Sequence, residues 1–175
     1  MDIGDRIIDF GLKGVDGKEH NLEEYADKKA IVILFTCNHC PYAQAYEDRF
    51  VEIQKDYASK GVQVIAINSN EDVNYPEDSF ENMIERSKKK KFNFPYLRDE
   101  DQSIARAYDA ACTPEVYLFD KDRELKYHGK IDDNWKHPTD VRDFYLRDAI
   151  DTVLAGGEVT FPEQPAIGCS IKWAR

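Results

Sequence analysis

The 175-residue chain lacks the features that mark membrane-spanning and secreted proteins. Its longest unbroken apolar run, residues 30–35, is strand-sized and far below the roughly 20 residues that a membrane-spanning helix needs. Four cysteines are too few for a disulfide-stapled secreted scaffold. Residues 1–5 contain neither the basic nor the apolar region of a secretory signal peptide. We therefore expect a cytoplasmic protein with no membrane partner.

Basic residues are scarce relative to acidic ones. The chain has 24 Lys and Arg against 34 Asp and Glu, which gives a formal net charge of −10 at pH 7. Phosphate backbones repel such a chain, so we expect no nucleic-acid partner. The apolar fraction of 42% is that of a globular protein, and the length suits one hydrophobic core rather than two. We expect residues 1–175 to form a single domain.

The N-terminal part of the chain shows strand patterns followed by a helix pattern. Residues 1–29 predict a β-hairpin, with strands at 7–10 and 19–22 around the turn-forming Asp16-Gly17. The apolar, β-branched run at 30–35 predicts a central strand buried on both faces. One apolar stripe then predicts a helix from about Cys40 to Gly61, with Pro41 in its first turn.

The remaining patterns complete an α/β arrangement. A second interior strand at 62–67 should be joined to the first by a right-handed parallel crossover. Further elements are expected in the order helix, short helix, strand, strand and helix: from Asp78 (with Glu81 as a capping-box partner), at 102–108, at 115–119, at 124–131 and at 140–155. Residues 158–175 are expected to form an irregular C-terminal tail. The order predicts a central mixed sheet flanked by helices.

Two of the four cysteines, Cys37 and Cys40, form a C-x-x-C pair at the predicted junction of strand and helix. The N–H groups and the dipole of a helix N-terminus stabilise a thiolate, which is the species that attacks a disulfide. The predicted chemistry is thiol–disulfide exchange through a mixed disulfide. We expect Cys37 to be the nucleophile and Cys40 the resolving thiol, because a residue ahead of the helix should be the more exposed. His39 is expected to lower the pKa of the thiolate.

A C-x-x-C pair is also compatible with metal binding. A structural zinc site commonly uses four ligands, whereas Cys112 and Cys169 are single and distant in sequence. Attachment of c-type haem needs a histidine after the second cysteine, where the chain has Pro41. We therefore expect no metal and no cofactor, and a non-catalytic, metal-binding module with the same fold is the alternative.

Three segments give the chain a family resemblance: Cys37-Asn38-His39-Cys40-Pro41-Tyr42, Cys112-Thr113-Pro114 and residues 168–173. They resemble the thioredoxin superfamily, and more narrowly the bacterial thioredoxin-like proteins of the redoxin group (alkyl hydroperoxide reductase and thiol-specific antioxidant). The resemblance implies a thioredoxin-like three-layer sandwich, here with an N-terminal hairpin extension. It also implies a cis proline at Pro114.

The same resemblance implies functions for the matching residues. Thr113 and Pro114 would hold the backbone of a substrate against the dithiol. The partners would be a disulfide-containing protein or small molecule, and a reductant or oxidant that recycles the enzyme. A peroxiredoxin-like thiol peroxidase is a further alternative, but the usual Pro-x-x-x-Thr/Ser-x-x-Cys loop is absent, since Leu34 stands three residues before Cys37.

The two outlying cysteines lead to two hypotheses. Cys112 is two residues before Pro114 and should lie beside the dithiol, whereas Cys169 lies in the tail. In the first hypothesis they form a second pair that exchanges disulfides with Cys37 and Cys40. In the second they are buried thiols that pack as small apolar side chains.

Overall fold

The structure is a computed structural model, and it describes residues 1–174. The strands are β1 (Gly11–Gly14), β2 (Glu19–Asn21), β3 (Ala30–Phe35), β4 (Val62–Asn68), β5 (Tyr96–Arg98), β6 (Cys112–Thr113), β7 (Glu115–Phe119), β8 (Leu125–Gly129), β9 (Glu163–Gln164) and β10 (Cys169–Ser170). The α-helices are α1 (Pro41–Tyr57), α2 (Phe80–Lys90), α3 (Ser103–Tyr108) and α4 (Tyr145–Leu154). Single 3-10 turns separate several of these elements.

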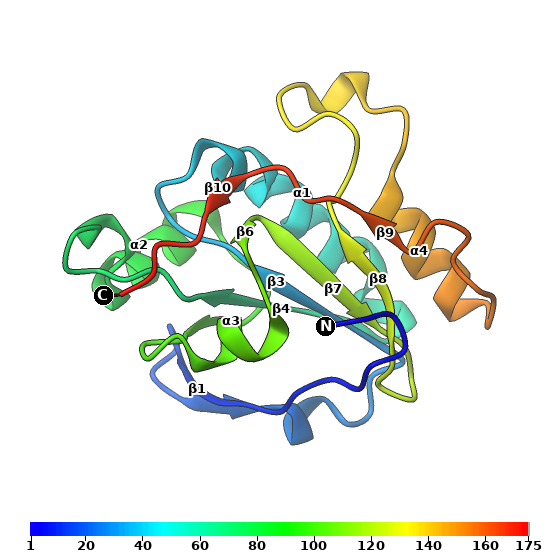
Figure 1. Cartoon of the computed structure of the whole chain (residues 1–175), viewed down its shortest axis with the longest axis horizontal. Helices are drawn as coiled ribbons and strands as arrows, with labels where there is room; N and C mark the ends of the chain where they lie inside the picture. Colours follow the sequence, from blue (N-terminus) through cyan, green and yellow to red (C-terminus); the bar gives the residue numbers. More distant parts are fainter. Residues whose placement is uncertain (175) are drawn as a thin grey trace.

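One mixed sheet forms the centre of the molecule (Figure 1). Its strand order is β2-β1-β5-β4-β3-β7-β8-β9, and β6 and β10 form a separate two-stranded ribbon. The central strand β3 runs parallel to β4 and antiparallel to β7. Every residue of β3 is buried, which explains why its sequence is an unbroken apolar run and not an alternating one.

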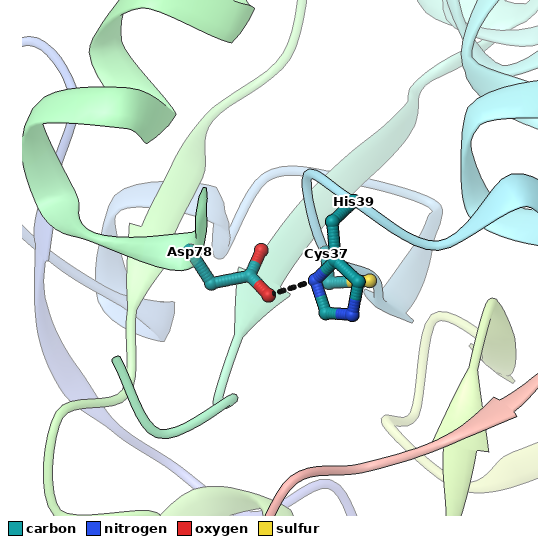
Figure 2. Close-up of side chains that lie close together, drawn as sticks. All are labelled: Cys37, His39 and Asp78. Carbon is teal, nitrogen blue, oxygen red and sulfur yellow. Dashed lines mark hydrogen bonds and ion pairs between the residues drawn. The ribbon is translucent and has the colours of Figure 1, made fainter. Parts of the chain in front are cut away.

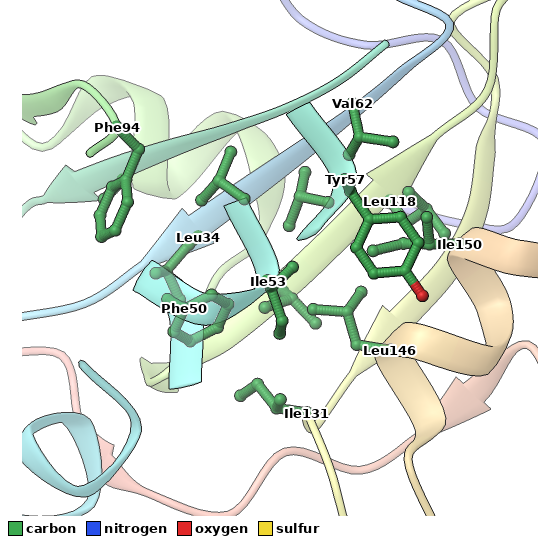
Figure 3. Close-up of a cluster of buried hydrophobic side chains, with 14 of the residues drawn as sticks. Leu34, Phe50, Ile53, Tyr57, Val62, Phe94, Leu118, Ile131, Leu146 and Ile150 are labelled. Atoms are coloured by element: carbon green, nitrogen blue, oxygen red, sulfur yellow. The ribbon is translucent and has the colours of Figure 1, made fainter. Parts of the chain in front are cut away.

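Helices cover both faces of the sheet. Successive side chains of a strand point to opposite faces, and β3 supplies both hydrophobic clusters in this way. Val32 and Leu34 pack with α1, α2 and α4 on one face, as Figure 3 shows for Leu34 beside Phe50 of α1. Ile31 and Ile33 pack with α3 and the N-terminal segment on the other face. The predicted three-layer α/β sandwich is therefore confirmed.

The N-terminal hairpin differs from its predicted position. Its first strand is β1 at Gly11–Gly14, so the prediction of a strand at 7–10 was wrong. The turn at Asp16-Gly17 is present, and Gly17 adopts a φ of +83°. Lys13 pairs with Glu19 across the hairpin, so the first strand runs up to the turn and does not end at residue 10. The hairpin forms one edge of the central sheet, where β1 pairs with β5.

Two helices begin later than predicted. Helix α2 begins at Phe80 rather than Asp78, because Ser79 is extended and its hydroxyl accepts a hydrogen bond from the N–H of Asn82. Helix α4 begins at Tyr145 rather than at residue 140, because Val141 is extended and interrupts the helical path. The short strand β5 was not predicted, since three residues are too few to show a period.

The C-terminal tail is more ordered than predicted. It contains β9, which extends the central sheet beside β8, and β10, which pairs with β6 (Figure 1). Among the helices of residues 1–174, none is both long and apolar enough to cross a membrane.

Candidate active site

The two cysteines of the C-x-x-C pair lie between β3 and α1. Cys40 is the extended residue that precedes the helix (φ −73°, ψ 125°), and Pro41 occupies the first helical position, where a missing N–H removes no helical hydrogen bond. Cys37 is only 1% exposed and Cys40 is fully buried. Both thiols are therefore buried, and the expected exposure of Cys37 is not found. The loop around Thr113 and the C-terminal tail pack against the pair and cover it.

Thr113 contacts both sulfur atoms. Its Oγ1 lies 3.4 Å from the Sγ of Cys37, and the Cys40 thiol can donate to its carbonyl oxygen at 3.6 Å. The bond between Thr113 and Pro114 is cis, as predicted. The Cys-Thr-Pro segment thus lies directly against the dithiol, as the sequence resemblance implied.

A hydrogen bond between the two thiols separates their pKa values. Donation of this bond to Cys40, burial and the charge of Asp78 together raise the pKa of Cys37. Acceptance of a hydrogen bond from Cys37 lowers the pKa of Cys40 and outweighs burial, which raises it; hydrogen bonds from Cys169 and from the N–H of Ala43 lower it further. In the reduced pair the negative charge is therefore more stable on Cys40 than on Cys37.

Asp78 is a site residue that the sequence did not reveal. It was predicted to start a helix, but its side chain is fully buried and lies beside the dithiol loop. It accepts the backbone N–H of Asn38 at 2.6 Å and contacts the Nδ1 of His39 at 2.5 Å, as Figure 2 shows for the second contact. The side-chain amides of Asn68 and Asn70 complete its hydrogen bonds at 3.1 Å each. No spacing in the sequence links residues 38 and 78, which the fold alone brings together.

His39 forms an ion pair with Asp78 whenever the imidazole is protonated. Its ring stacks on Tyr75, with centroids 5.5 Å apart, and its side chain is 25% exposed. The Asp78 charge raises the pKa of Cys37, so a protonated His39 would counteract this effect by neutralising the carboxylate. That His39 lowers the pKa of the thiolate stays a prediction.

Cys37, His39 and Asp78 also form a potential metal-ligand set. One ligand atom from each lies within 4.8 Å of the other two. A structural zinc site usually has four protein ligands, and within residues 1–174 this set offers three. The Nδ1 of His39 is also already hydrogen-bonded to Asp78. The arrangement therefore matches a hydrogen-bonded chain of side chains more closely than a preformed structural zinc site.

The tail brings Cys169 against the dithiol cluster, and Cys112 is not part of that cluster. In the ribbon of β6 and β10, Cys169 is registered with Thr113, and Ser170 with Cys112. Paired residues on neighbouring strands point to the same face of the ribbon, and consecutive residues on one strand point to opposite faces. The side chain of Cys169 therefore lies on the same face as that of Thr113, and the side chain of Cys112 lies on the other face. Cys169 packs against the cluster that contains Cys37 and Cys40. The structure does not support a second pair made of Cys112 and Cys169.

Cys112 has an environment of its own. Its Sγ lies 3.9 Å from the carboxylate of Glu115, which also accepts its backbone N–H at 3.1 Å. Burial and the Glu115 charge raise the pKa of Cys112 to about 12. The position and the raised pKa fit the hypothesis of an inert, partly buried thiol.

Comparisons with known proteins place the chain in a family. A structure of an uncharacterized conserved protein from Geobacillus kaustophilus is 43% identical, with a TM-score of 0.93, and covers 99% of this chain and 93% of its own. Thiol-disulfide oxidoreductase ResA of Geobacillus kaustophilus (strain HTA426) is 29% identical over 71% of this chain and 67% of that protein.

A thiol:disulfide interchange protein of the thioredoxin family, from Chlorobium tepidum TLS, shares the fold with a TM-score of 0.68 at 18% identity, over 88% of this chain and 99% of its own. The family model that matches residues 3–128 is that of the AhpC/TSA family. Because this match spans most of the sequence, the chain belongs to the AhpC/TSA family.

Proposed function

We propose that the protein is a thiol–disulfide oxidoreductase in which Cys37 and Cys40 cycle between a dithiol and a disulfide. The observation that carries the proposal is the packing of both thiols in one buried cluster at the start of α1, directly against Thr113. Two thiols packed together in this way can be joined in a disulfide. The name of the ResA relatives supports the same chemistry.

The proposed reaction begins with a thiolate of the pair attacking one sulfur of a substrate disulfide. A mixed disulfide forms and the other half of the substrate leaves as a thiolate. The second cysteine then attacks the mixed disulfide, releases the other half and closes the Cys37–Cys40 disulfide. Two electrons pass from the dithiol to the substrate, and the reverse sequence oxidises a substrate dithiol. A second thiol or disulfide partner would return the pair to its starting state.

Cys37 is proposed as the first nucleophile on the basis of its surroundings. Cys40 is enclosed by Cys37, Thr113 and the tail, whereas Cys37 adjoins the partly exposed His39. Although the charge of the reduced pair is more stable on Cys40, transfer of the Cys37 proton to the adjacent Cys40 thiolate would move the charge to Cys37. Thr113 and Pro114 are proposed to position the substrate.

A groove next to His39 gives a substrate a place to bind. It has a volume of about 650 Å³ and is lined by Glu71, Asn74, Tyr75 and residues 170–174 of the tail. Tyr75 connects the groove to the site, because its ring stacks on His39. The polar lining suits a disulfide-bearing peptide or a small polar disulfide.

The experiment compares wild type with Cys37→Ser and Cys40→Ser in the reduction of a fluorescent disulfide-linked peptide. Cys37→Ser should lose most of its turnover, and Cys40→Ser should accumulate a mixed disulfide with the peptide that is visible by mass spectrometry. Cys112→Ser serves as the matched control and should keep wild-type turnover. Full activity in Cys37→Ser would contradict the proposal. Stoichiometric metal with protected thiols in the purified protein would favour the metal-binding alternative instead.

A further inference from the structure

The C-terminal tail contributes a strand at the Cys-Thr-Pro segment. Figure 1 shows β10 beside β6, and the register joins Cys169 to Thr113, the residue that contacts both sulfurs of the dithiol. The approach is unusually close at Gly168, where a Cβ atom would lie 1.9 Å from the carbonyl oxygen of Thr113. Only glycine fits this position without displacing one of the two segments.

The tail is firmly held directly after this contact. Ile171 is buried, and its N–H donates to the carbonyl of Ala111 at 3.0 Å. The carbonyl of Lys172 accepts from the side-chain amide of Gln102 at 2.7 Å and from the N–H of Glu71 at 2.8 Å. These bonds fix Cys169 within the site, so its thiol is a constant neighbour of the dithiol.

Cys40 packs with Cys37 in one buried cluster, and Cys169 packs against the same cluster. Both neighbouring thiols affect the pKa of Cys40. Cys169 is the more accessible of the three, since it is only partly buried whereas Cys37 and Cys40 are buried. A disulfide between Cys40 and Cys169 would therefore be easier for an external thiol to reach than one between Cys37 and Cys40.

We propose that Cys169 is a third redox thiol, which attacks Cys40 in the Cys37–Cys40 disulfide and takes over the bond. The Sγ–Sγ bond between Cys40 and Cys169 forms, the bond between Cys37 and Cys40 breaks, and Cys37 leaves as a thiolate. The Cys169 proton passes to solvent or to Cys37, and no electrons are gained or lost. The inference rests on the proposed Cys37–Cys40 couple. It assigns Cys169 as the site at which the recycling thiol attacks.

The charges of the site would make Cys169 attack only after the dithiol has been oxidised. Burial and hydrogen bonding to Cys40 raise the pKa of Cys169 to about 11, so Cys169 keeps its proton while Cys40 carries the thiolate. When Cys40 enters a disulfide, its negative charge is lost and Cys169 ionises more readily. The ammonium of Lys172 favours that ionisation. Cys169 would thus become nucleophilic only after the dithiol has been oxidised.

The test uses Cys37→Ser, which retains three thiols and cannot form the Cys37–Cys40 bond. After equilibration with oxidised glutathione, this variant should lose two of its three free thiols and yield a Cys40–Cys169 linked peptide in mass spectrometry. The Cys37→Ser/Cys112→Ser variant should form the same bond, and Cys37→Ser/Cys169→Ser should form no internal disulfide. Oxidised wild type should contain both the Cys37–Cys40 and the Cys40–Cys169 linkage.

The outcomes separate this inference from the proposed function. Wild type and Cys169→Ser could form the Cys37–Cys40 disulfide reversibly while no Cys40–Cys169 peptide is found in any protein. In that case the proposed redox role of Cys169 is wrong, and the proposed Cys37–Cys40 couple is retained. If neither protein shows a reversible couple, the proposed function itself fails. Because wild type supplies a direct readout, the test does not depend on how well the variants fold.

Discussion

At the dithiol, the carboxylate of Asp78 lies within 4.8 Å of the Cys37 sulfur and has no solvent exposure. Four hydrogen-bond partners hold this carboxylate, among them His39. A buried negative charge disfavours a second one nearby, so Asp78 opposes ionisation of Cys37. Asp78 and His39 therefore act on Cys37 as one unit, whose net charge depends on whether the imidazole is protonated.

Replacing Asp78 with Asn should lower the pKa of Cys37. The amide keeps the shape of the side chain but removes the negative charge that raises the pKa. We expect a fall of about one unit or more, the usual effect of a charge at this range. The measurement is the pH dependence of alkylation of Cys37 in a Cys40→Ser background, read at the Cys37 peptide.

Two further variants make this measurement specific. Glu77→Gln removes an exposed acidic side chain one residue away and should leave the alkylation midpoint unchanged. His39→Gln removes the imidazole that balances the Asp78 charge when it is protonated, so it should move the midpoint to higher pH. An unchanged or higher midpoint in Asp78→Asn would mean that Asp78 does not control the thiol.

The carboxyl group of Glu115 makes a contribution to the stability of the fold that is lost in acid. Burial raises its pKa, but hydrogen bonds from His128 and from the N–H groups of Ala111 and Cys112 outweigh burial, so the pKa is lowered overall. Because the pKa of Glu115 is lower in the folded protein than in the unfolded chain, the hydrogen bonds to its carboxylate stabilise the fold at pH values above the pKa of the unfolded chain. This stabilisation is lost as the pH falls through the pKa of the folded protein.

Glu115→Gln should therefore destabilise the protein at pH 7 by about 1–3 kcal/mol, the cost of weakened charged hydrogen bonds in a buried site. The difference from wild type should shrink as the pH falls below about 4, where the carboxyl group of the unfolded chain is protonated. Urea unfolding at several pH values measures both. Glu52→Gln, which changes an exposed side chain on α1, should show no such difference. A constant gap between wild type and Glu115→Gln across pH would refute the assignment.

The elements with a clear apolar pattern were predictable from the sequence. The apolar runs of β3 and β7 are buried at every position, and the apolar stripe on α1 faces the core, so each pattern led to the correct element. The strands β1 and β5 escaped prediction, because they are short and their pairing depends on partners far along the chain. The same reason hid β10, whose two residues are defined by contact with β6.

The candidate site divides in the same way. Cys37 and Cys40 could be predicted from a local motif with a physical meaning, and the cis Pro114 from the family resemblance of the Cys-Thr-Pro segment. Asp78 could not, because it reaches the site only through the turn that precedes α2. The relative exposure of Cys37 and Cys40 was also beyond the sequence, since the segments that cover them come from residues 113 and 169.

Gly168→Ala tests the contact between β10 and β6. The added methyl group would overlap the carbonyl oxygen of Thr113, so the tail has to move away. We expect a loss of about 1–3 kcal/mol in unfolding free energy, typical of overpacking. Oxidised Gly168→Ala should also contain less of the Cys40–Cys169 linkage than wild type.

Gly157→Ala is the matched control for this substitution. Its added methyl group would meet the side-chain methyl of Thr152 at 3.3 Å, which can adjust. This variant should unfold close to wild type and keep the wild-type pattern of disulfides. If Gly168→Ala were as stable as Gly157→Ala and contained as much of the Cys40–Cys169 linkage, the close contact between the tail and Thr113 would affect neither stability nor disulfide formation.

Across the whole molecule, four separate segments meet at the dithiol. The loop after β3 supplies the two cysteines, the turn before α2 supplies Asp78, the β6 segment supplies Thr113 and the tail supplies Cys169. The central sheet places the first two segments at the same edge, since β3 and β4 are parallel and both segments follow their carboxyl ends. The tail then closes the site from the opposite end of the chain.

The most direct test of the central claim is a redox titration of the wild-type protein in glutathione buffers, with free thiols counted at each potential. We predict one reversible two-electron transition, with a tenfold change in the ratio of oxidised to reduced protein for every ~30 mV, in which two of the four thiols disappear. The transition should be absent from a Cys37→Ser/Cys40→Ser double variant. Four thiols that stay free at every potential, or a transition that persists in the double variant, would contradict the account.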